Sequence, residues 1–221
     1  MEKKENLLGY SINSLEVFFA SINEPKFRAK QVLKWIHQKG ITDFSQMTDL
    51  NKLLREKLES IACIIPPEVE EIHSSPEGTK KYLIKLSSGS MVEMVKIPEK
   101  KRMTLCISSQ AGCALQCTFC ATGAQGFEKN LTADEIIGQV WLANFHEDDV
   151  TPITNVVFMG MGEPLLNFNP VIESAKIMKD QMAYGLSRKR ITISTSGITP
   201  QIDKLSESID VSLAISLHAP I

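Results

Sequence analysis

Residues 103–123, MTLCISSQAGCALQCTFCATG, constrain the fold most strongly. Residues 103–108 are mostly apolar or β-prone and predict a strand, which runs directly into a loop that carries Cys113, Cys117 and Cys120. The same order of strand, loop and helix recurs downstream. Strands are predicted at residues 103–108, 153–159, 191–195 and 211–217, and helices at residues 132–145, 170–182 and 200–206. Such alternation predicts an α/β fold with a parallel sheet, which binds ligands at the carboxyl ends of its strands.

Upstream of this region, residues 11–60 are predicted to be helical. Apolar side chains recur at i, i+3, i+4 and i+7 along residues 27–37, and a second amphipathic helix is predicted at residues 51–60. Residues 61–76 contain three prolines and three glutamates, which indicates a connector. Two β-prone runs flank the sequence SSGS within residues 81–97, and this pattern predicts a β-hairpin.

The chain is therefore expected to have three parts. Residues 1–75 form a helical accessory domain, residues 76–102 a β-hairpin linker, and residues 103–221 an α/β core. A buried parallel strand normally continues into a helix that covers it, but the sequence stops three residues after His218, where the last predicted strand ends. We therefore expect the core to be truncated before its last strand–helix units.

Composition and charge narrow the class of protein. The chain has 221 residues, of which 43% are hydrophobic and 23% charged, as in ordinary globular proteins. An apolar run long enough for a membrane span and an N-terminal export signal are both missing from the sequence, so a cytoplasmic protein without membrane contact is expected. Residues 76–130 carry eight basic and four acidic side chains, a bias that permits a polyanionic partner.

The cysteines favour a metal or redox cofactor over disulfides. Their number, five, is odd, and four of them fall between residues 106 and 120. Three thiolates with the spacing CxxxCxxC can bind one face of an iron–sulfur cluster. A structural zinc ion would need a fourth ligand, for which only Cys106 and scattered histidines are present. The spacing therefore favours a [4Fe–4S] cluster with one open iron over zinc.

The motif CxxxCxxC with Phe119 before the last cysteine, placed after the first strand of a β/α repeat, resembles the radical S-adenosylmethionine (SAM) superfamily. The segments 106–113, 119–127 and 158–167 are similar to those of the adenine-C2 RNA methyltransferase family. This resemblance implies a partial (β/α) radical-SAM barrel with a [4Fe–4S] cluster and SAM. It also implies methylation of C2 of one adenosine in 23S rRNA and in certain tRNAs.

The resemblance implies roles for individual residues. The cluster ligands would be Cys113, Cys117 and Cys120. The SAM contacts would be Phe119, Gly162, Glu163, Ser194, Ser216, Leu217 and His218. From the residues alone, core packing for Phe119, a strand-end hydroxyl for Ser194 and a structural role for His218 remain open alternatives.

Two further roles follow from the resemblance alone. Glu93 would be the proton acceptor, and Cys106 would resolve a covalent RNA–protein adduct by forming a disulfide with a methyl-carrying cysteine. Without the resemblance, Glu93 is an exposed hairpin glutamate and Cys106 a packed strand cysteine. The family's methyl-carrying cysteine lies near its C-terminus, where this chain has none. We therefore expect the chain alone to be inactive in methyl transfer.

Other functions remain open. The C8-adenosine 23S rRNA methyltransferase of the antibiotic-resistance type has the same cluster motif, although residues 164–167, PLLN, fit the C2 family better. A cluster-bearing electron carrier, a zinc protein and a non-catalytic RNA-binding module are further alternatives. Lys30, Lys34 and Lys39 suit either an RNA-binding surface or a solvated helix face. The expected partners are 23S rRNA, tRNA and a reducing electron donor such as flavodoxin, and the expected state is a monomer.

Overall fold

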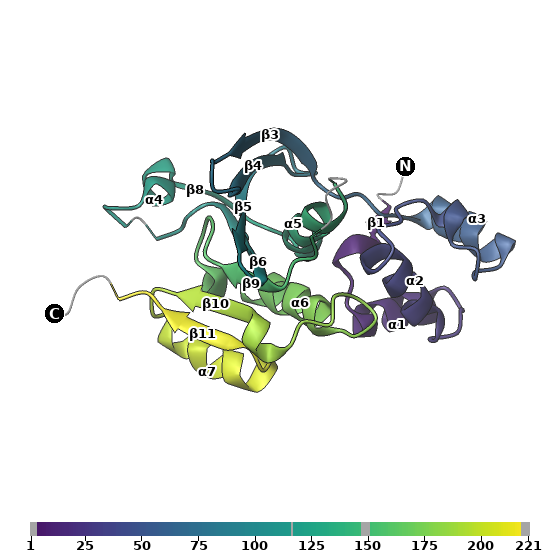
Figure 1. The fold of residues 1–221 in the computed structure, drawn as a ribbon. Helices are drawn as coiled ribbons and strands as arrows, with labels where there is room; N and C mark the ends of the chain where they lie inside the picture. Colours follow the sequence, from purple (N-terminus) through teal and green to yellow (C-terminus); the bar gives the residue numbers. More distant parts are fainter. Residues whose placement is uncertain (1–3, 116, 147–150, 218–221) are drawn as a thin grey trace.

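A seven-stranded mixed sheet organises the described part of the chain, which comprises residues 4–115, 117–146 and 151–217 of a computed structural model (Figure 1). Its strand order is β11-β10-β9-β6-β5-β4-β3. The parallel part consists of β6 (Arg102–Cys106), β9 (Asn155–Phe158), β10 (Ile191–Thr195) and β11 (Ser212–Ile215). The antiparallel part consists of β3 (Glu68–Ser74), β4 (Lys80–Lys85) and β5 (Met91–Glu99). The predicted α/β class with a parallel sheet is confirmed.

Helices connect the parallel strands, as predicted. They are α5 (Ala133–Phe145), α6 (Phe168–Lys179) and α7 (Thr199–Ser208), and α6 is preceded by a short 3-10 turn, Pro164–Asn167. Helix α5 begins at a capping box in which the Glu135 carboxylate accepts the Thr132 N–H at 3.0 Å. No helix within the described ranges is long and apolar enough to span a bilayer.

The N-terminal region is helical, as predicted. It contains α1 (Ile12–Ser21), α2 (Arg28–His37) and α3 (Lys52–Ile61), together with the parallel pair β1 (Glu5–Asn6) and β2 (Ala62–Cys63) and the 3-10 turns Leu7–Gly9 and Phe44–Gln46. The apolar stripe of α2 is fully buried at Val32, Leu33 and Ile36. Trp141 of α5 donates its indole N–H to the Ile36 carbonyl at 3.0 Å, which ties α2 to the core.

The interpretation of residues 61–76 as a connector is wrong. These residues contain β2 and the whole of β3, which pairs antiparallel with β4. The prolines lie outside β3 rather than within it, so they bound the strand without interrupting its hydrogen bonds. The glutamates remain exposed because β3 is an edge strand, and charged side chains protect such an edge from pairing with other chains.

The predicted hairpin is present as β4 and β5, and it is continuous with the parallel strands. Val95 of β5 pairs directly with Cys106 of β6, so one sheet crosses the expected boundary at residue 102. The loop after β6 carries three short elements that were not predicted: β7 (Gln110–Gly112), α4 (Ala121–Gln125) and β8 (Phe127–Asn130). A further 3-10 turn, Arg188–Arg190, precedes β10.

The buried His37 predicts acid sensitivity. Its ring Nδ1 lies 3.0 Å from the Tyr184 hydroxyl, and burial lowers the His37 pKa to about 3. The unfolded chain therefore binds a proton at His37 below about pH 6.5 that the folded chain does not bind, and stability falls as the pH falls. At pH 5 this effect should cost about 2 kcal/mol of the free energy of unfolding relative to pH 8. Urea unfolding at both pH values measures it.

The control variants isolate His37. A His37→Gln variant keeps a hydrogen-bonding side chain that does not titrate, so it should lose most of this pH dependence. A matched His73→Gln variant changes an exposed histidine on β3 and should keep the wild-type dependence. Equal pH dependence in the His37→Gln variant and the wild type would contradict the assignment.

Candidate active site

A cavity of about 480 Å³ opens at the carboxyl ends of β9, β10 and β11, against the cysteine loop that follows β6 and β7. Two larger hollows, of about 840 and 620 Å³, lie beside the N-terminal region, and their lining contains none of the three motif cysteines. The 480 Å³ cavity is therefore the one that matches the expected chemistry. Its walls are formed by Cys113, Leu115, Cys117, Phe119, Cys120, Phe158, Met159, Gly160, Gly162, Glu163, Pro164, Ser194, Thr195, Ser196, Ala214, Ile215 and Ser216.

Most of the predicted cofactor residues meet in this cavity. The three motif cysteines line it, and so do five expected SAM contacts: Phe119, Gly162, Glu163, Ser194 and Ser216. Leu217 is 80% exposed and lies outside the lining. His218 lies outside the described residues.

The cysteine loop is held by backbone hydrogen bonds. Cys113 donates its N–H to the Gly126 carbonyl at 2.9 Å, and Cys120 donates to the Cys117 carbonyl at 3.1 Å. The Cys113 sulfur accepts the Leu115 N–H at 3.4 Å. These contacts leave all three thiols partly exposed on one side of the cavity.

The electrostatics of the loop favour a cationic ligand. Burial raises the pKa of the Cys113 thiol, and the neighbouring thiols and Glu163 raise it further, against an opposing hydrogen bond from Leu115. Grouped thiolates are stabilised by a metal, and three soft donors around one cavity suit an iron–sulfur cluster. Among the described residues, no three His, Cys, Asp or Glu side chains are arranged to bind a single metal ion.

The loop after β9 forms the facing wall. Glu163 is 4% exposed, and its carboxylate accepts three protein hydrogen bonds: from the Ser196 N–H at 2.8 Å, the Ser196 hydroxyl at 3.0 Å and the Leu165 N–H at 3.0 Å. Glu163 therefore joins the loops that follow β9 and β10. With most carboxylate positions used, the remaining backbone carbonyls of this loop are the better acceptors for a ligand ammonium group.

Two serines complete the wall at β10 and β11. The hydroxyls of Ser194 and Ser216 lie 3.2 Å apart, and Ser216 donates its N–H to the Thr195 carbonyl at 2.9 Å. Neighbouring hydroxyls at the ends of parallel strands can bind a polar ligand such as a ribose. Ser196 was not predicted, and the only signal for it in the sequence is its place before Gly197 at the end of a strand.

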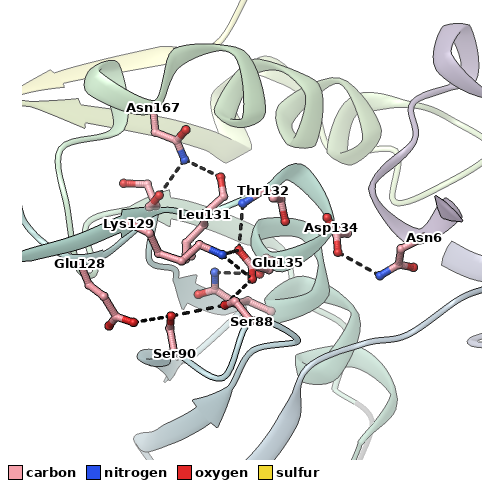
Figure 2. A network of polar contacts seen from close by, with 12 residues as sticks. Asn6, Ser88, Ser90, Glu128, Lys129, Leu131, Thr132, Asp134, Glu135 and Asn167 are labelled. Carbon is pink, nitrogen blue, oxygen red and sulfur yellow. Dashed lines mark hydrogen bonds and ion pairs between the residues drawn. The ribbon is translucent and has the colours of Figure 1, made fainter. Parts of the chain in front are cut away.

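A partly buried polar network fixes the segment that leaves the cysteine loop (Figure 2). Lys129 of β8 lies 2.9 Å from the Glu135 carboxylate, and the Ser88 hydroxyl donates to the same carboxylate at 2.8 Å. Burial alone would raise the Glu135 pKa, but the hydrogen bonds from Thr132, Lys129 and Ser88 together lower it. The hairpin turn, β8 and the start of α5 are thus joined at one ionised carboxylate.

Glu93 and Cys106 do not line the cavity, but they share one face of the sheet beside it. Cys106 pairs with Val95, and Glu93 lies two residues from Val95 on the same strand, so the two side chains point to the same side. Lys81 of β4 lies 2.7 Å from the Glu93 carboxylate. Burial raises the pKa of the Cys106 thiol, although a backbone hydrogen bond with Met159, a cavity residue, opposes the shift.

Gly162 is required by the geometry of the glycine loop. Its φ is +97°, and a Cβ at this position would lie 2.5 Å from the Gln110 Cβ. We therefore expect a Gly162→Ala variant to lose about 2 kcal/mol or more of unfolding free energy, because backbone strain and steric overlap add. Urea unfolding measures the loss.

Gly197 provides the matched control. Its φ is +111°, but a Cβ there would meet no atom within 4 Å. A Gly197→Ala variant therefore carries the backbone strain without the overlap and should lose less stability. Equal losses in the two variants would mean that the close approach to Gln110 contributes nothing.

Comparison with known proteins agrees with this site. Residues 107–220 match the radical SAM superfamily, and residues 5–64 match the ribosomal RNA large subunit methyltransferase N-terminal domain. The chain is 59% identical over 222 residues to the dual-specificity RNA methyltransferase RlmN of Pseudomonas putida, and 54% identical over 223 residues to that of Marinobacter nauticus. These alignments cover 98% and 99% of the chain but only 58% and 60% of the relatives.

A solved structure gives the same result. A radical SAM methyltransferase from Sphaerobacter thermophilus superposes with a TM-score of 0.88 at 36% sequence identity, and the match covers 98% of this chain and 64% of that one. The predicted partial radical-SAM fold is confirmed. With its superfamily match extending over more than half of the sequence, this chain belongs to the radical SAM superfamily.

Proposed function

We propose that the protein acts as a radical SAM methyltransferase on C2 of an adenosine in 23S rRNA and in certain tRNAs. The observation that carries the proposal is the single cavity that unites the three motif cysteines with the loops after β9, β10 and β11. The dual-specificity RNA methyltransferases that the chain matches support an RNA substrate. The chain spans about 58% of their length, so the complete reaction is proposed for a protein of the relatives' length.

The residues that line the cavity have different proposed roles. Cys113, Cys117 and Cys120 would hold a [4Fe–4S] cluster, and Gly162 and Glu163 would shape the loop that receives the methionine part of SAM. When bound, these cofactors would supply the carbon radical that the substrate carbon requires. Phe119, Ser194 and Ser216 would orient the nucleoside part of SAM.

Glu93 and Cys106 would act after the new carbon bond forms. Glu93 is the proposed acceptor of the C2 proton, and Cys106 the proposed nucleophile that releases the RNA. Their shared face beside the cavity supports this division. Leu217 and His218 remain proposed SAM contacts. A reducing donor such as flavodoxin, a monomeric state and a cytoplasmic location complete the proposal.

The test is anaerobic reconstitution of the chain with iron and sulfide, followed by SAM and dithionite. We expect about four irons per chain and formation of 5′-deoxyadenosine, but no RNA methylation by the chain alone. Iron without SAM binding or cleavage would instead indicate an electron carrier. Mass analysis of RNA treated with a protein of the relatives' length would identify the product, and 8-methyladenosine would replace the C2 assignment with the C8 alternative.

A further inference from the structure

Gln110 lies behind the cavity rather than in it. It begins β7, is 1% exposed and is not among the residues that line the cavity. Its side-chain amide nevertheless contacts three separate segments of the site. Gln110 lies three residues before Cys113 and therefore outside the CxxxCxxC motif, so the motif assigns it no cofactor role.

The amide oxygen joins the two facing walls. Gln110 Oε1 accepts the Glu163 N–H at 2.9 Å, from the loop after β9, and the Ala114 N–H at 3.4 Å, from the residue that follows Cys113. The first contact has the length of a strong hydrogen bond, and the second is longer and weaker. One oxygen atom thus sets the spacing between the cysteine loop and the glycine loop.

The amide nitrogen fixes the side chain from the other end. Gln110 Nε2 donates to the Asn130 side-chain oxygen at 2.8 Å, which anchors the amide on β8. The Gln110 stem also fills the space that a Cβ at Gly162 would occupy. With both ends bound and the stem enclosed, the side chain has a single orientation.

The link continues to the third wall. Glu163 receives its backbone position from Gln110 and uses its own carboxylate to hold the Ser196 N–H and hydroxyl. The cysteine loop, the loop after β9 and the loop after β10 are therefore connected in series through two buried side chains. A shift of the Gln110 amide would move all three walls relative to one another.

We propose that Gln110 is a positioning residue that sets the distance between the cluster-binding loop and the SAM-binding loops. The assignment of these loops to a cluster and to SAM rests on the proposed function. The hydrogen bonds themselves do not, so the proposal has a test that needs no cofactor.

The first measurement is amide hydrogen exchange of the chain without cofactors. A Gln110→Met variant keeps the length of the side chain and removes its hydrogen bonds. We expect exchange in the peptides that contain Ala114, Glu163 and Ser196 to become about tenfold faster. The N–H groups of Ala114 and Glu163 lose their acceptor, and the Ser196 N–H is held by Glu163, whose own backbone is then less well fixed.

Gln139 offers a matched control. It is equally buried, and its amide accepts the Ser108 N–H at 2.8 Å and donates to the Ser108 carbonyl at 2.9 Å, without touching the cysteine loop. A Gln139→Met variant should speed exchange at Ser108 and leave Ala114 and Glu163 unchanged. Equal acceleration of Ala114 and Glu163 in both variants would overturn the proposal.

A milder variant covers the case in which Gln110→Met does not fold. Asn130 is exposed, so Asn130→Ala should fold and only release the nitrogen end of the Gln110 amide. We expect faster exchange at Glu163 and Ala114 in this variant too. Wild-type exchange rates at both sites would contradict a positioning role for Gln110.

The second measurement uses the reconstituted chain. At equal iron content, Gln110→Met should weaken SAM binding by about tenfold relative to the wild type and Gln139→Met. The change of the reduced cluster's electron paramagnetic resonance spectrum with SAM concentration reports this affinity. Unchanged affinity would overturn the link to SAM. A wild-type chain that binds no SAM would refute the proposed function, while the exchange data would still decide whether Gln110 positions the loops.

Discussion

Replacing Cys117 with alanine is expected to abolish iron binding by the reconstituted chain. Three thiolates are the proposed protein ligands of the cluster, and the loss of one leaves two soft donors on one wall of an open cavity. Iron and sulfide analysis should fall from about four per chain to background, and the charge-transfer absorption at roughly 400 nm should disappear. Cys113→Ala and Cys120→Ala should behave in the same way.

The two remaining cysteines supply matched controls. Cys63 lies on β2 and lines a different hollow, so Cys63→Ala should keep full iron content. Cys106→Ala tests the number of ligands, because a four-cysteine site would need Cys106. Full iron content in Cys106→Ala together with loss in Cys117→Ala would confirm three ligands. Full iron content in Cys117→Ala would refute the assignment.

The regular parts of the fold could be predicted because their patterns are local. The strand at residues 191–195 was predicted with the bounds that β10 has. Helix α5 follows from its capping box, and helices α6 and α7 overlap the ranges predicted for them between the strands. Strand β3 was missed because its side chains are mostly polar and exposed, which is the pattern of a connector as well as of an edge strand. Its pairing with β4, a tertiary contact, decides between the two.

The candidate site also has parts that the sequence predicts and parts that it does not. The cysteine spacing and the glycine loop are sequence motifs, so their residues could be named before their meeting in one cavity was known. The contacts of Gln110, Glu163 and Ser196 could not be predicted, because each joins loops that are far apart in the sequence. The sequence does not show from which N–H group a buried amide or carboxylate oxygen will accept a hydrogen bond.

In a protein of the relatives' length, replacing Cys106 with alanine is expected to trap RNA on the protein. The family resemblance implies that a methylene group joins the substrate carbon to the methyl-carrying cysteine. The Cys106 thiolate would attack the sulfur of that cysteine and form a disulfide as the bond between sulfur and the methylene carbon breaks. The electron pair of the broken bond would pass to the methylene carbon and the purine ring, and this carbon would take up a proton to become the methyl group. Without this attack the covalent adduct persists. Because burial raises the Cys106 pKa, the attack needs a proton acceptor, and release should slow at acidic pH.

Glu93→Ala should trap the same kind of adduct at an earlier step. The proton on C2 must leave before the bridge can break, and removal of a general base typically costs about a hundredfold or more in rate. Glu93 and Cys106 share one face of β5 and β6, and neither lines the cluster cavity, so both variants should keep iron and SAM cleavage. Glu99→Ala is the matched control, since Glu99 lies at the far end of β5.

A denaturing gel of labelled RNA separates the outcomes. Cys106→Ala and Glu93→Ala should each give a slow band that protease digestion removes, whereas the wild type, Glu99→Ala and Cys63→Ala should give none. Treatment with a small thiol should leave the Cys106→Ala band unchanged, because a carbon–sulfur bond resists thiol exchange and a disulfide does not. A Cys106→Ala enzyme that turns over freely without an RNA-linked band would show that Cys106 is only a packed residue of β6.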